Sequence, residues 1–301
     1  MRFRMWVKGS ALLGMCVLLV VLAGSPSRAS EDEAHQVRIG LVSSLFRDTS
    51  EALMQIIMRP FKSLLEKQTG MKGQLVSGGD AQHLGQRLKQ GEVHLGIFHG
   101  VEYAWAKSRF PQLKPLLIAV NKQPFLRAHL LVRAEGAIQG IDDLKGRTID
   151  LPTLSREHCW LFLERRCVPV GQKADKFFAR INRPRDAAYA IENVIEGTSH
   201  AAVVDDADLA AYRTQSPESF AKIRLLKQSE PFPCAVIAYQ PGTLSDSLLA
   251  QFRTGMLAAK NSKQGQRMMQ MCRITSFEEV PEDFDKTLED IAKAYPPPPL
   301  K

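Results

Sequence analysis

The chain has 301 residues, of which 45% are hydrophobic and 24% charged, a composition that suits one large globular unit or two smaller ones. Its formal net charge is +8, but Lys and Arg form no block of the kind that binds nucleic acid, so we expect no nucleic-acid partner. The cysteines form neither a CxxC pair nor a CxxCH motif, so nothing in the sequence indicates a zinc ribbon or a c-type haem.

The first 29 residues have the three parts of a secretory signal. A basic start (1–8) precedes an apolar stretch (11–24), and Ser27–Ala29 offers small side chains to a signal peptidase. The apolar stretch is too short for a stable membrane anchor, and Ser25 stands where a lipoprotein would carry its cysteine. We therefore expect an exported chain of about 272 residues without a lipid anchor, with 36 basic against 32 acidic residues.

Strand-like and helix-like segments alternate after the signal. The hydrophobic pattern predicts strands at 36–44, 72–78, 92–100 and 113–120, and helices at 49–67, 80–91 and 101–109. Asp48 or Thr49 would cap the first of these helices. Such alternation predicts a mostly parallel sheet with helices on both faces.

The pattern changes near 122–135, where an extended segment leads into a short helix and a strand. A second series then has predicted helices at 156–167, 184–196 and 206–214 and predicted strands at 176–181, 200–204 and 222–228. The segment 231–239 is interpreted as a return strand, followed by helices at 244–260, 263–271 and 283–293.

The chain is therefore expected to form two α/β lobes and to cross between them twice, near 123–127 and 229–234. Lobe 1 would comprise 30–124 and 234–293, and lobe 2 would comprise 125–233. The remaining residues, 294–301, are interpreted as a solvated proline-rich tail.

Four cysteines follow the signal: Cys159, Cys167, Cys234 and Cys272. In an oxidising compartment they could form two disulfides in any of three pairings, or remain reduced and buried. Cys159 and Cys167 would lie about 12 Å apart along one predicted helix, too far for a bridge between them. The sequence leaves their redox state open.

Four stretches occur in an order that resembles a known family. They are GEVHLGIFHGVEYAWA (91–106), LLVRAEGAIQGIDDLKGRTI (130–149), RDAAYAIENVIEGTSHAAVVDD (185–206) and SEPFPCAVIAY (229–239). This order resembles the type 2 periplasmic solute-binding proteins, and among them the phosphate, phosphite and phosphonate group that serves ABC importers. The resemblance implies an α/β, two-lobed fold whose lobes close on a ligand cleft between them.

The resemblance also implies partners and a location. We expect a periplasmic protein that captures a small-molecule ligand and delivers it to an inner-membrane ABC permease. No cofactor and no catalysis are implied, the processed chain would not be embedded in the membrane, and a monomer is expected.

Loops that follow a strand and precede a helix gather ligands in open α/β sheets, and helix N-termini favour negative groups. The expected ligand contacts are Ser43, Ser44, Phe98, His99, Tyr103, Ser155, Arg156, Glu157, His158, Arg185, Asp205 and Asp206. Capping of a helix is the structural alternative for Ser155, Asp205 and Asp206. Tyr103 matches an aromatic residue of the family, and Arg185 replaces a family histidine with a donor fork suited to an oxyanion.

The ligand is expected to be a small anion of the phosphonate or oxyanion type. Phosphonate binders grip the oxyanion with a serine-rich segment that matches 153–162, and this chain does not reproduce that segment. Arg156 would attract such an anion and Glu157 would repel it. The identity of the ligand therefore stays open.

Two other functions remain as alternatives. The same clamp could serve a membrane histidine kinase that senses an oxyanion or a soft metal species such as arsenite, with Cys159, Cys234 and His158 as ligands. The structural alternative is that these cysteines are packed small residues or disulfide partners. An enzyme on this fold is less favoured, because adjacent helix residues such as His158 and Cys159 point about 100° apart.

Overall fold

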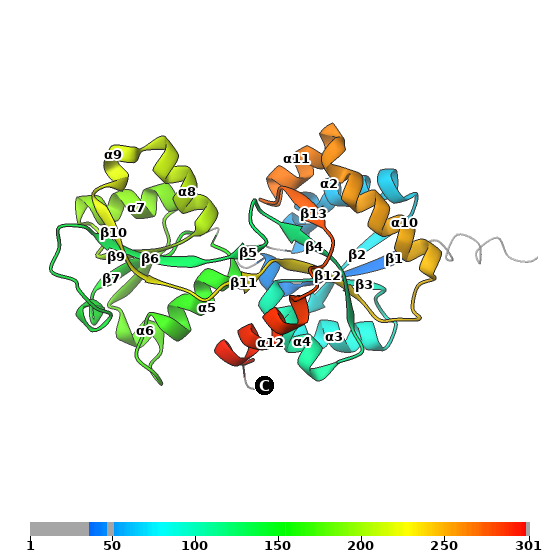
Figure 1. Ribbon diagram of the computed structural model, residues 1–301, viewed down its shortest axis with the longest axis horizontal. Coiled ribbons are helices and arrows are strands. Elements are labelled where there is room, and N and C mark those ends of the chain that lie inside the picture. The colour runs from blue at the N-terminus through cyan, green and yellow to red at the C-terminus, as the bar shows by residue number, and fades with distance from the viewer. Residues whose placement is uncertain (1–35, 47–50, 154, 299–301) are drawn as a thin grey trace, which may run out of the picture. The chain divides into compact units, whose positions relative to one another are not determined.

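The computed structural model describes residues 36–46, 51–153 and 155–298 (Figure 1). The expected signal and the expected capping residues Asp48 and Thr49 lie outside these ranges. Of the helices that are described, none has the length and apolar character needed to cross a membrane.

The first sheet has six strands within the described residues, in the order β13-β4-β12-β3-β1-β2. Their bounds are β1 (Gln36–Val42), β2 (Lys72–Gly79), β3 (Leu95–Phe98), β4 (Lys114–Val120), β12 (Ala235–Tyr239) and β13 (Ser276–Glu278). β1 pairs in parallel with β2 and β3, whereas β12 lies antiparallel between β3 and β4. The predicted parallel order is therefore right for the direction of β1 to β4, which all run the same way. β12, which the sequence predicted as a return strand, runs antiparallel to them, as does β13, a strand that the sequence did not predict.

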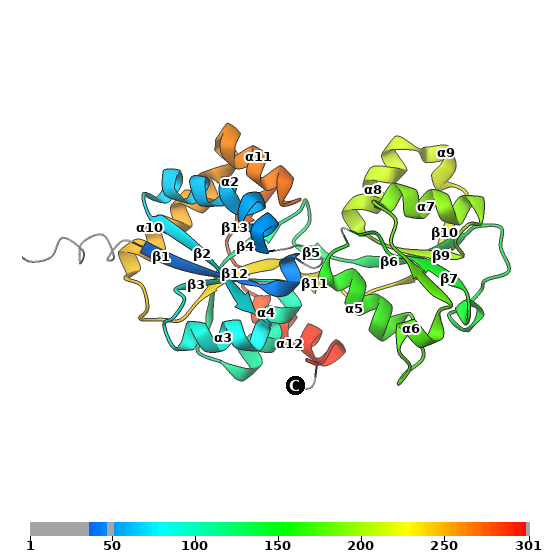
Figure 2. The same ribbon diagram turned by 180° about the vertical axis from the view of Figure 1, so that it is seen from behind.

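Helices cover both faces of this sheet (Figures 1 and 2). Their bounds are η1 (Ser43–Phe46), α2 (Glu51–Thr69), α3 (Ala81–Lys89), α4 (Gly100–Arg109), α10 (Asp246–Leu257), η3 (Ala258–Asn261), α11 (Lys263–Met271) and α12 (Phe284–Ala294). One apolar cluster joins α3, α4 and α12 to the sheet, and a second joins α2, α10 and α11 to it. This two-faced burial is why the strands are apolar on both sides.

The second sheet has five strands among the residues described, in the order β10-β6-β9-β7-β8. Its strands are β6 (Ala128–Arg133), β7 (Thr148–Asp150), β8 (Arg180–Asn182), β9 (Ala201–Asp205) and β10 (Ile223–Gln228). Around it lie η2 (Asp142–Leu144), α5 (Glu157–Arg166), α6 (Ala174–Phe177), α7 (Ala187–Glu196), α8 (Asp206–Gln215) and α9 (Pro217–Phe220). The prediction of a strand at 176–181 is wrong at its start, because Phe177 ends the short helix α6 with its side chain buried in the core.

The chain passes between the two sheets twice. The first passage contains β5 (Phe125–Leu126) and the second contains β11 (Phe232–Pro233), and these two short strands pair antiparallel with each other. The two passages therefore form one hydrogen-bonded connection between the sheets.

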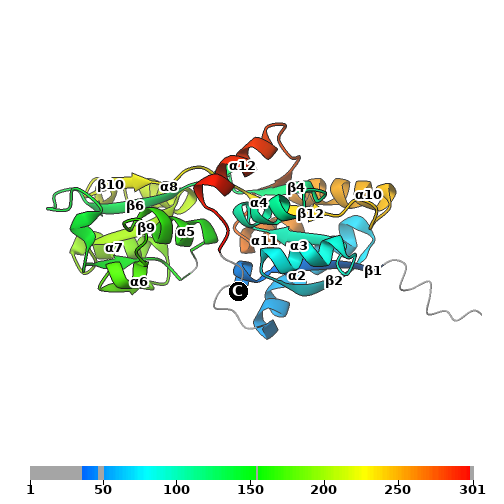
Figure 3. The same ribbon diagram turned by 90° about the horizontal axis from the view of Figure 1, so that it is seen from below.

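The C-terminal segment packs against this connection instead of forming a solvated tail from residue 294. Ala294 ends α12, and the side chain of Tyr295 is fully buried. The Tyr295 ring lies 4.6 Å from the ring of Phe232. The backbone carbonyl of Tyr295 accepts a hydrogen bond of 2.7 Å from Trp105 Nε1 of α4. Figure 3 shows the end of α12 close to α5, the first helix of the second sheet. Of the described residues that follow Tyr295, Pro296, Pro297 and Pro298 are exposed.

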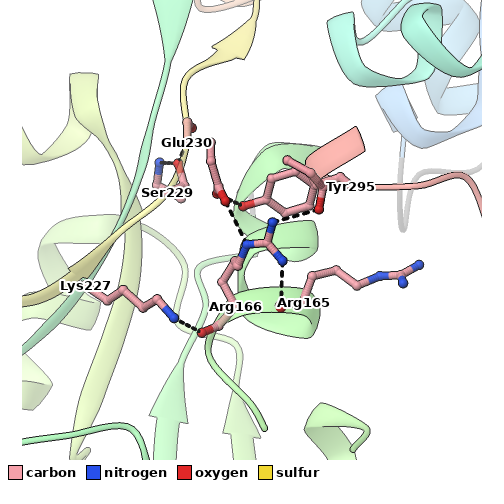
Figure 4. Close-up of polar contacts among 8 residues, drawn as sticks. Arg165, Arg166, Lys227, Ser229, Glu230 and Tyr295 are labelled. Atoms are coloured by element: carbon pink, nitrogen blue, oxygen red, sulfur yellow. Dashed lines mark hydrogen bonds and ion pairs between the residues drawn. The ribbon is translucent and has the colours of Figure 1, made fainter. Parts of the chain in front are cut away.

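Four residues join the two sheets at this point, and we call them the crossing junction: Arg166, Glu230, Phe232 and Tyr295. The Tyr295 hydroxyl donates to Glu230 Oε2 at 2.6 Å, and Arg166 Nε donates to Glu230 Oε1 at 2.8 Å (Figure 4). Arg166 Nη2 also donates to the carbonyl of Ala294 at 2.8 Å, and its guanidinium lies 4.7 Å from the centre of the Tyr295 ring. Burial raises the pKa of Glu230, but the hydrogen bonds from Tyr295 and Arg166 outweigh this and hold the pKa below its usual range.

We predict that Tyr295→Ala lowers the free energy of unfolding by about 3–5 kcal/mol, because it leaves a cavity against Phe232. Tyr295→Phe keeps the ring and loses only the bond to Glu230, so it costs about 1 kcal/mol. Urea unfolding of residues 30–301 measures both values. The exposed Pro297 provides the control, since Pro297→Ala leaves the unfolding free energy unchanged. Equal stability of Tyr295→Ala and the natural chain would contradict the role of the crossing junction.

Candidate functional site

Two helices begin beside β11: α4, which packs against the first sheet, and α5, which packs against the second. A Cβ atom on Gly100, the first residue of α4, would lie 2.2 Å from the carbonyl oxygen of Pro233. In the first turn of α5, the His158 ring lies 5.6 Å from the ring of Phe232. The N-termini of α4 and α5 therefore both lie beside the same two-residue strand.

Both helix N-termini can hold a negative group. Their N-cap residues are His99 for α4 and Arg156 for α5, and neither forms a side-chain capping bond. The first N–H groups of a helix have no partner within the helix, and the helix dipole places partial positive charge there. These two N-termini and the residues beside them are the candidate site.

The β9–α8 turn adds carboxylates to the candidate site. Asp205 ends β9 and caps α8, accepting a hydrogen bond of 2.9 Å from the N–H of Asp208, so the capping alternative is confirmed for Asp205. The N–H of Asp206 donates to the carbonyl of Arg127 at 3.1 Å, and its side chain pairs with His129.

His158 is connected to the same turn and is kept neutral. Its ring is hydrogen-bonded to the backbone of Arg127, the residue whose carbonyl also binds Asp206. Burial is the largest influence on this histidine and lowers its pKa to about 4. His158 is therefore an uncharged member of the candidate site at neutral pH.

Two arginines and two aspartates form what we call the ion cluster: Arg156, Arg273, Asp205 and Asp208. Arg273 follows α11, and its guanidinium binds Asp208 and lies 3.7 Å from Asp205 Oδ2. Arg156 Nε lies 4.0 Å from the same oxygen, and Arg156 Nη2 donates to the carbonyl of Arg273. The cluster thus joins α5 and α8 of the second sheet to the α11–β13 segment of the first.

The charges in the ion cluster shift its two carboxyl groups in opposite directions. Burial raises the pKa of Asp205, but His158, Arg273 and Arg156, in that order, outweigh burial and hold that pKa below the usual range. Burial and the adjacent Asp205 raise the pKa of Asp208. Asp205 is therefore the firmly ionised carboxylate of the cluster, and Asp208 is the easier one to protonate.

On the side of the first sheet, Ser44 and Glu102 meet at the start of α4. Ser44 Oγ donates to Glu102 Oε2 at 2.5 Å, and Glu102 is buried with 6% of its surface exposed. Ser43 precedes Ser44 at the start of η1 and is exposed. The expected residues Ser44, His99, Arg156, Glu157, His158, Asp205 and Asp206 thus all lie at these strand ends and helix starts.

Phe98 and Tyr103 lie at the start of α4 with their side chains in the core, and Arg185 lies away from the starts of α4 and α5. Phe98 and Tyr103 are fully buried in the core with ring centres 5.8 Å apart. The Tyr103 hydroxyl donates to the carbonyl of Leu113, which precedes β4 at the opposite end of the sheet. The exposed Arg185 pairs with the adjacent Asp186 at 2.9 Å, so its guanidinium already has a carboxylate partner.

Ser155 precedes the candidate site but does not cap α5. The helix begins one residue later than the sequence indicated, and its N-cap is Arg156, so the capping interpretation of Ser155 is wrong. The Ser155 N–H instead donates to the carbonyl of Pro152 at 3.0 Å, which closes a turn before the helix.

The cysteines do not form a soft-ligand site. Cys159, Cys167, Cys234 and Cys272 are all free thiols. Cys159 Sγ lies 3.5 Å from His158 Nε2, whereas Cys234 Sγ donates to the carbonyl of Gln123 at 3.5 Å. Within the described ranges, no three His, Cys, Asp or Glu side chains are arranged to hold a metal ion, so the structure adds no support to a soft-ligand site of Cys159, Cys234 and His158.

Arg273, Asp208 and Glu102 belong to this region although the sequence did not indicate them. Arg273 lies between a helix and a three-residue strand that was not predicted, so no pattern placed it near a strand end. Asp208 and Glu102 lie within the first turns of predicted helices, where acidic residues are common for electrostatic reasons alone.

Two α/β sheets joined by two paired crossings, with helix N-termini meeting at the crossing, are the architecture of a two-lobed solute-binding protein. Residues 44–284 match the family model of the ABC transporter, phosphonate, periplasmic substrate-binding proteins. The chain belongs to this family. No curated protein sequence matches the chain.

Solved structures show the same fold at low sequence identity. A Xanthomonas citri protein with bound ATP has a TM-score of 0.59 and 15% identity, over 87% of this chain and 97% of that one. PhnD1 from Prochlorococcus marinus in complex with methylphosphonate has a TM-score of 0.56 and 13% identity, over 86% and 97% of the two chains. A binding protein component of an ABC phosphonate transporter from Pseudomonas aeruginosa has a TM-score of 0.55 and 14% identity, over 85% of each chain.

We predict that Gly100→Ala destabilises the protein by about 3 kcal/mol, because the added methyl group would overlap the backbone of β11. Gly140→Ala is the matched control, since a Cβ there meets no atom within 4 Å. Chemical denaturation of the two variants gives the comparison. If Gly100→Ala were as stable as Gly140→Ala, α4 could not begin in contact with β11.

We predict that the unfolding free energy falls as the pH drops from 6.5 toward 4. The unfolded chain protonates His158 near its ordinary pKa of 6.5, whereas the folded protein does so only near 4. The stabilisation from neutral His158 is therefore complete above pH 6.5 and is lost progressively below it. Urea unfolding at stepwise pH tests this, with His158→Gln as the comparison. A variant that loses stability as steeply as the natural chain in this range would exclude His158 as the cause.

Proposed function

We propose that the protein captures a small anion of the phosphonate or oxyanion class and delivers it to an inner-membrane ABC permease. The observation that carries this proposal is the approach of the N-termini of α4 and α5 to β11, because each offers N–H groups to an anion. Arg156 supplies a cationic donor fork at the start of α5.

The proposed capture mechanism uses the two sheets as two lobes. Lobe 1 would consist of 30–124 and 234–293, and lobe 2 of 125–233, with β5 and β11 as the hinge. Because the two helix N-termini come from different sheets, rotation about β5 and β11 would open or close the anion site. Closure around the ligand lets both helix N-termini act on it at once.

The family supports a periplasmic binding role, and the basic and apolar parts of residues 1–29 support export by a cleaved signal. The proposed partner is the permease, and the proposed state is a monomer that releases its ligand unchanged. The site offers no catalytic pair, since His158 and Cys159 are buried and burial raises the pKa of the Cys159 thiol. Neither the family nor the site favours the alternative of a histidine-kinase partner.

A thermal-shift screen of the exported chain against methylphosphonate, phosphite, phosphate, sulfonates and carboxylates tests the proposal. Ligand at a hundred times its dissociation constant adds about 2.7 kcal/mol of stability. We expect a shift with at least one phosphorus oxyanion, and recovery of that anion unchanged after incubation. No shift with any of these anions, or conversion of the anion, would overturn the proposal.

Arg156→Gln is expected to weaken binding of the same anion about tenfold or more, since a charge-assisted bond is lost. Arg185→Gln is the matched control, because Arg185 is exposed and paired with Asp186. Titration calorimetry of both variants separates a specific role of Arg156 from a general effect of positive charge. Equal loss in both variants would contradict the assignment of Arg156.

A further inference from the structure

We infer that Arg273 is a positioning residue of the anion site. It neutralises Asp205 and Asp208, and this leaves the guanidinium of Arg156 available to the ligand. The inference rests on the proposed function, because it concerns the same anion and the same helix N-terminus. It assigns a role to a segment between α11 and β13 that lies far along the chain from every other residue of the site.

The distances show which arginine is the closer ion-pair partner of the two carboxylates. Arg273 binds Asp208 directly and approaches Asp205 Oδ2 to 3.7 Å. Arg156 is 4.0 Å from that oxygen, and its hydrogen bond goes to the carbonyl of Arg273 instead. Arg273 is thus the principal counter-ion of the aspartates, and its backbone also orients Arg156.

The backbone of Arg273 is held in an uncommon conformation that makes both contacts possible. Its φ is +55°, in the left-handed region, and Lys122 is the other non-glycine residue there within the described chain. Hydrogen bonds on either side maintain this turn: the Arg273 N–H donates to Gln270 at 3.1 Å, and the Thr275 N–H donates to Val120 at 2.7 Å. Strain of this kind persists where the surrounding structure imposes it, often at functional sites.

The charge balance explains why Arg273 matters for an anion. With Arg273 present, the ion cluster contains two guanidinium groups and two carboxylates. Without it, Arg156 would be the remaining arginine of the cluster, and Coulomb attraction would draw it toward the carboxylates of Asp205 and Asp208. The start of α5 would then face uncompensated negative charge, which repels an anionic ligand.

Two of the four members of the ion cluster are accessible from solvent. Arg273 and Asp208 line a hollow of about 420 Å³ together with Lys122, Gln266 and Gln270. About a third of each of the two charged side chains is exposed, with values of 32% for Arg273 and 31% for Asp208. A substitution that changes the charge of Arg273 or Asp208 therefore alters a side chain that is already partly in contact with solvent.

The test measures methylphosphonate and phosphate binding by titration calorimetry with the exported chain and four variants. Arg273→Gln is expected to weaken binding about tenfold, and the double variant Arg273→Gln/Asp208→Asn to recover most of that loss. Asp208→Asn alone is expected to bind the anion more tightly than the natural chain, because one repelling charge is gone. Arg267→Gln, an exposed change on α11, is the control and leaves affinity unchanged.

The sign of the Asp208→Asn effect distinguishes positioning from a structural role. If the contact between Arg273 and Asp208 only held the segments together, Asp208→Asn would bind the anion more weakly than the natural chain, and the double variant would bind it more weakly still. Either result overturns the inference. The Asp208→Asn result does so even if Arg273→Gln fails to fold. Equal affinity of Arg273→Gln and the natural chain overturns the inference alone. If the natural chain binds neither probe nor any other anion of the screen, the proposed function fails, and the inference fails with it.

Discussion

The pairing of β5 with β11 is the constraint on which the rest of this structure depends. β11 has two residues, yet Gly100 of α4, His158 of α5 and Tyr295 after α12 all pack against it. Because β11 is also tied to β5 by backbone pairing, a shift of one of these three residues disturbs the packing of the others. Any change in the angle between the sheets therefore acts where the two helix N-termini meet.

The candidate site contains its own counter-ions, which limits how it can recognise an anion. Asp205 and Asp208 offset Arg156 and Arg273, so the site has no large excess of positive charge. Taking charged groups out of water is costly unless they are paired and hydrogen-bonded, and this cluster meets that condition. An anion must therefore gain from directed N–H groups and the fork of Arg156, which makes the arrangement of donors more important than net charge.

Local patterns were sufficient to predict most of the fold. The alternation of strands and helices was correct for the units from β1 to β4 and for α11, whose predicted and observed bounds are the same. The errors fall where contacts far apart in sequence decide the outcome. β13 forms because Thr275 and its neighbours pair with β4, and Tyr295 is buried because Trp105 and Glu230 bind it.

The same distinction explains what could be predicted of the site. Arg156, His158 and Asp205 follow strands and start helices, so the sequence indicated them. Arg273 depends on a left-handed turn and on partners more than 60 positions away, which no short pattern contains. Phe98 and Tyr103 lie near a strand end as expected, but their large apolar rings gain more from the core than from a polar cleft.

The burial of Tyr295 also has a consequence for the order in which the molecule is completed. The bond from Trp105 spans 190 positions and the bond from Arg166 to Ala294 spans 128, so neither can form until α12 and Tyr295 have been synthesised. The second sheet can collapse earlier, since its helices and strands are consecutive in the chain, whereas the first sheet also needs β12 and β13. The contacts that Tyr295 makes with both halves therefore form after the second half has folded, and they stabilise an arrangement whose parts are already in place.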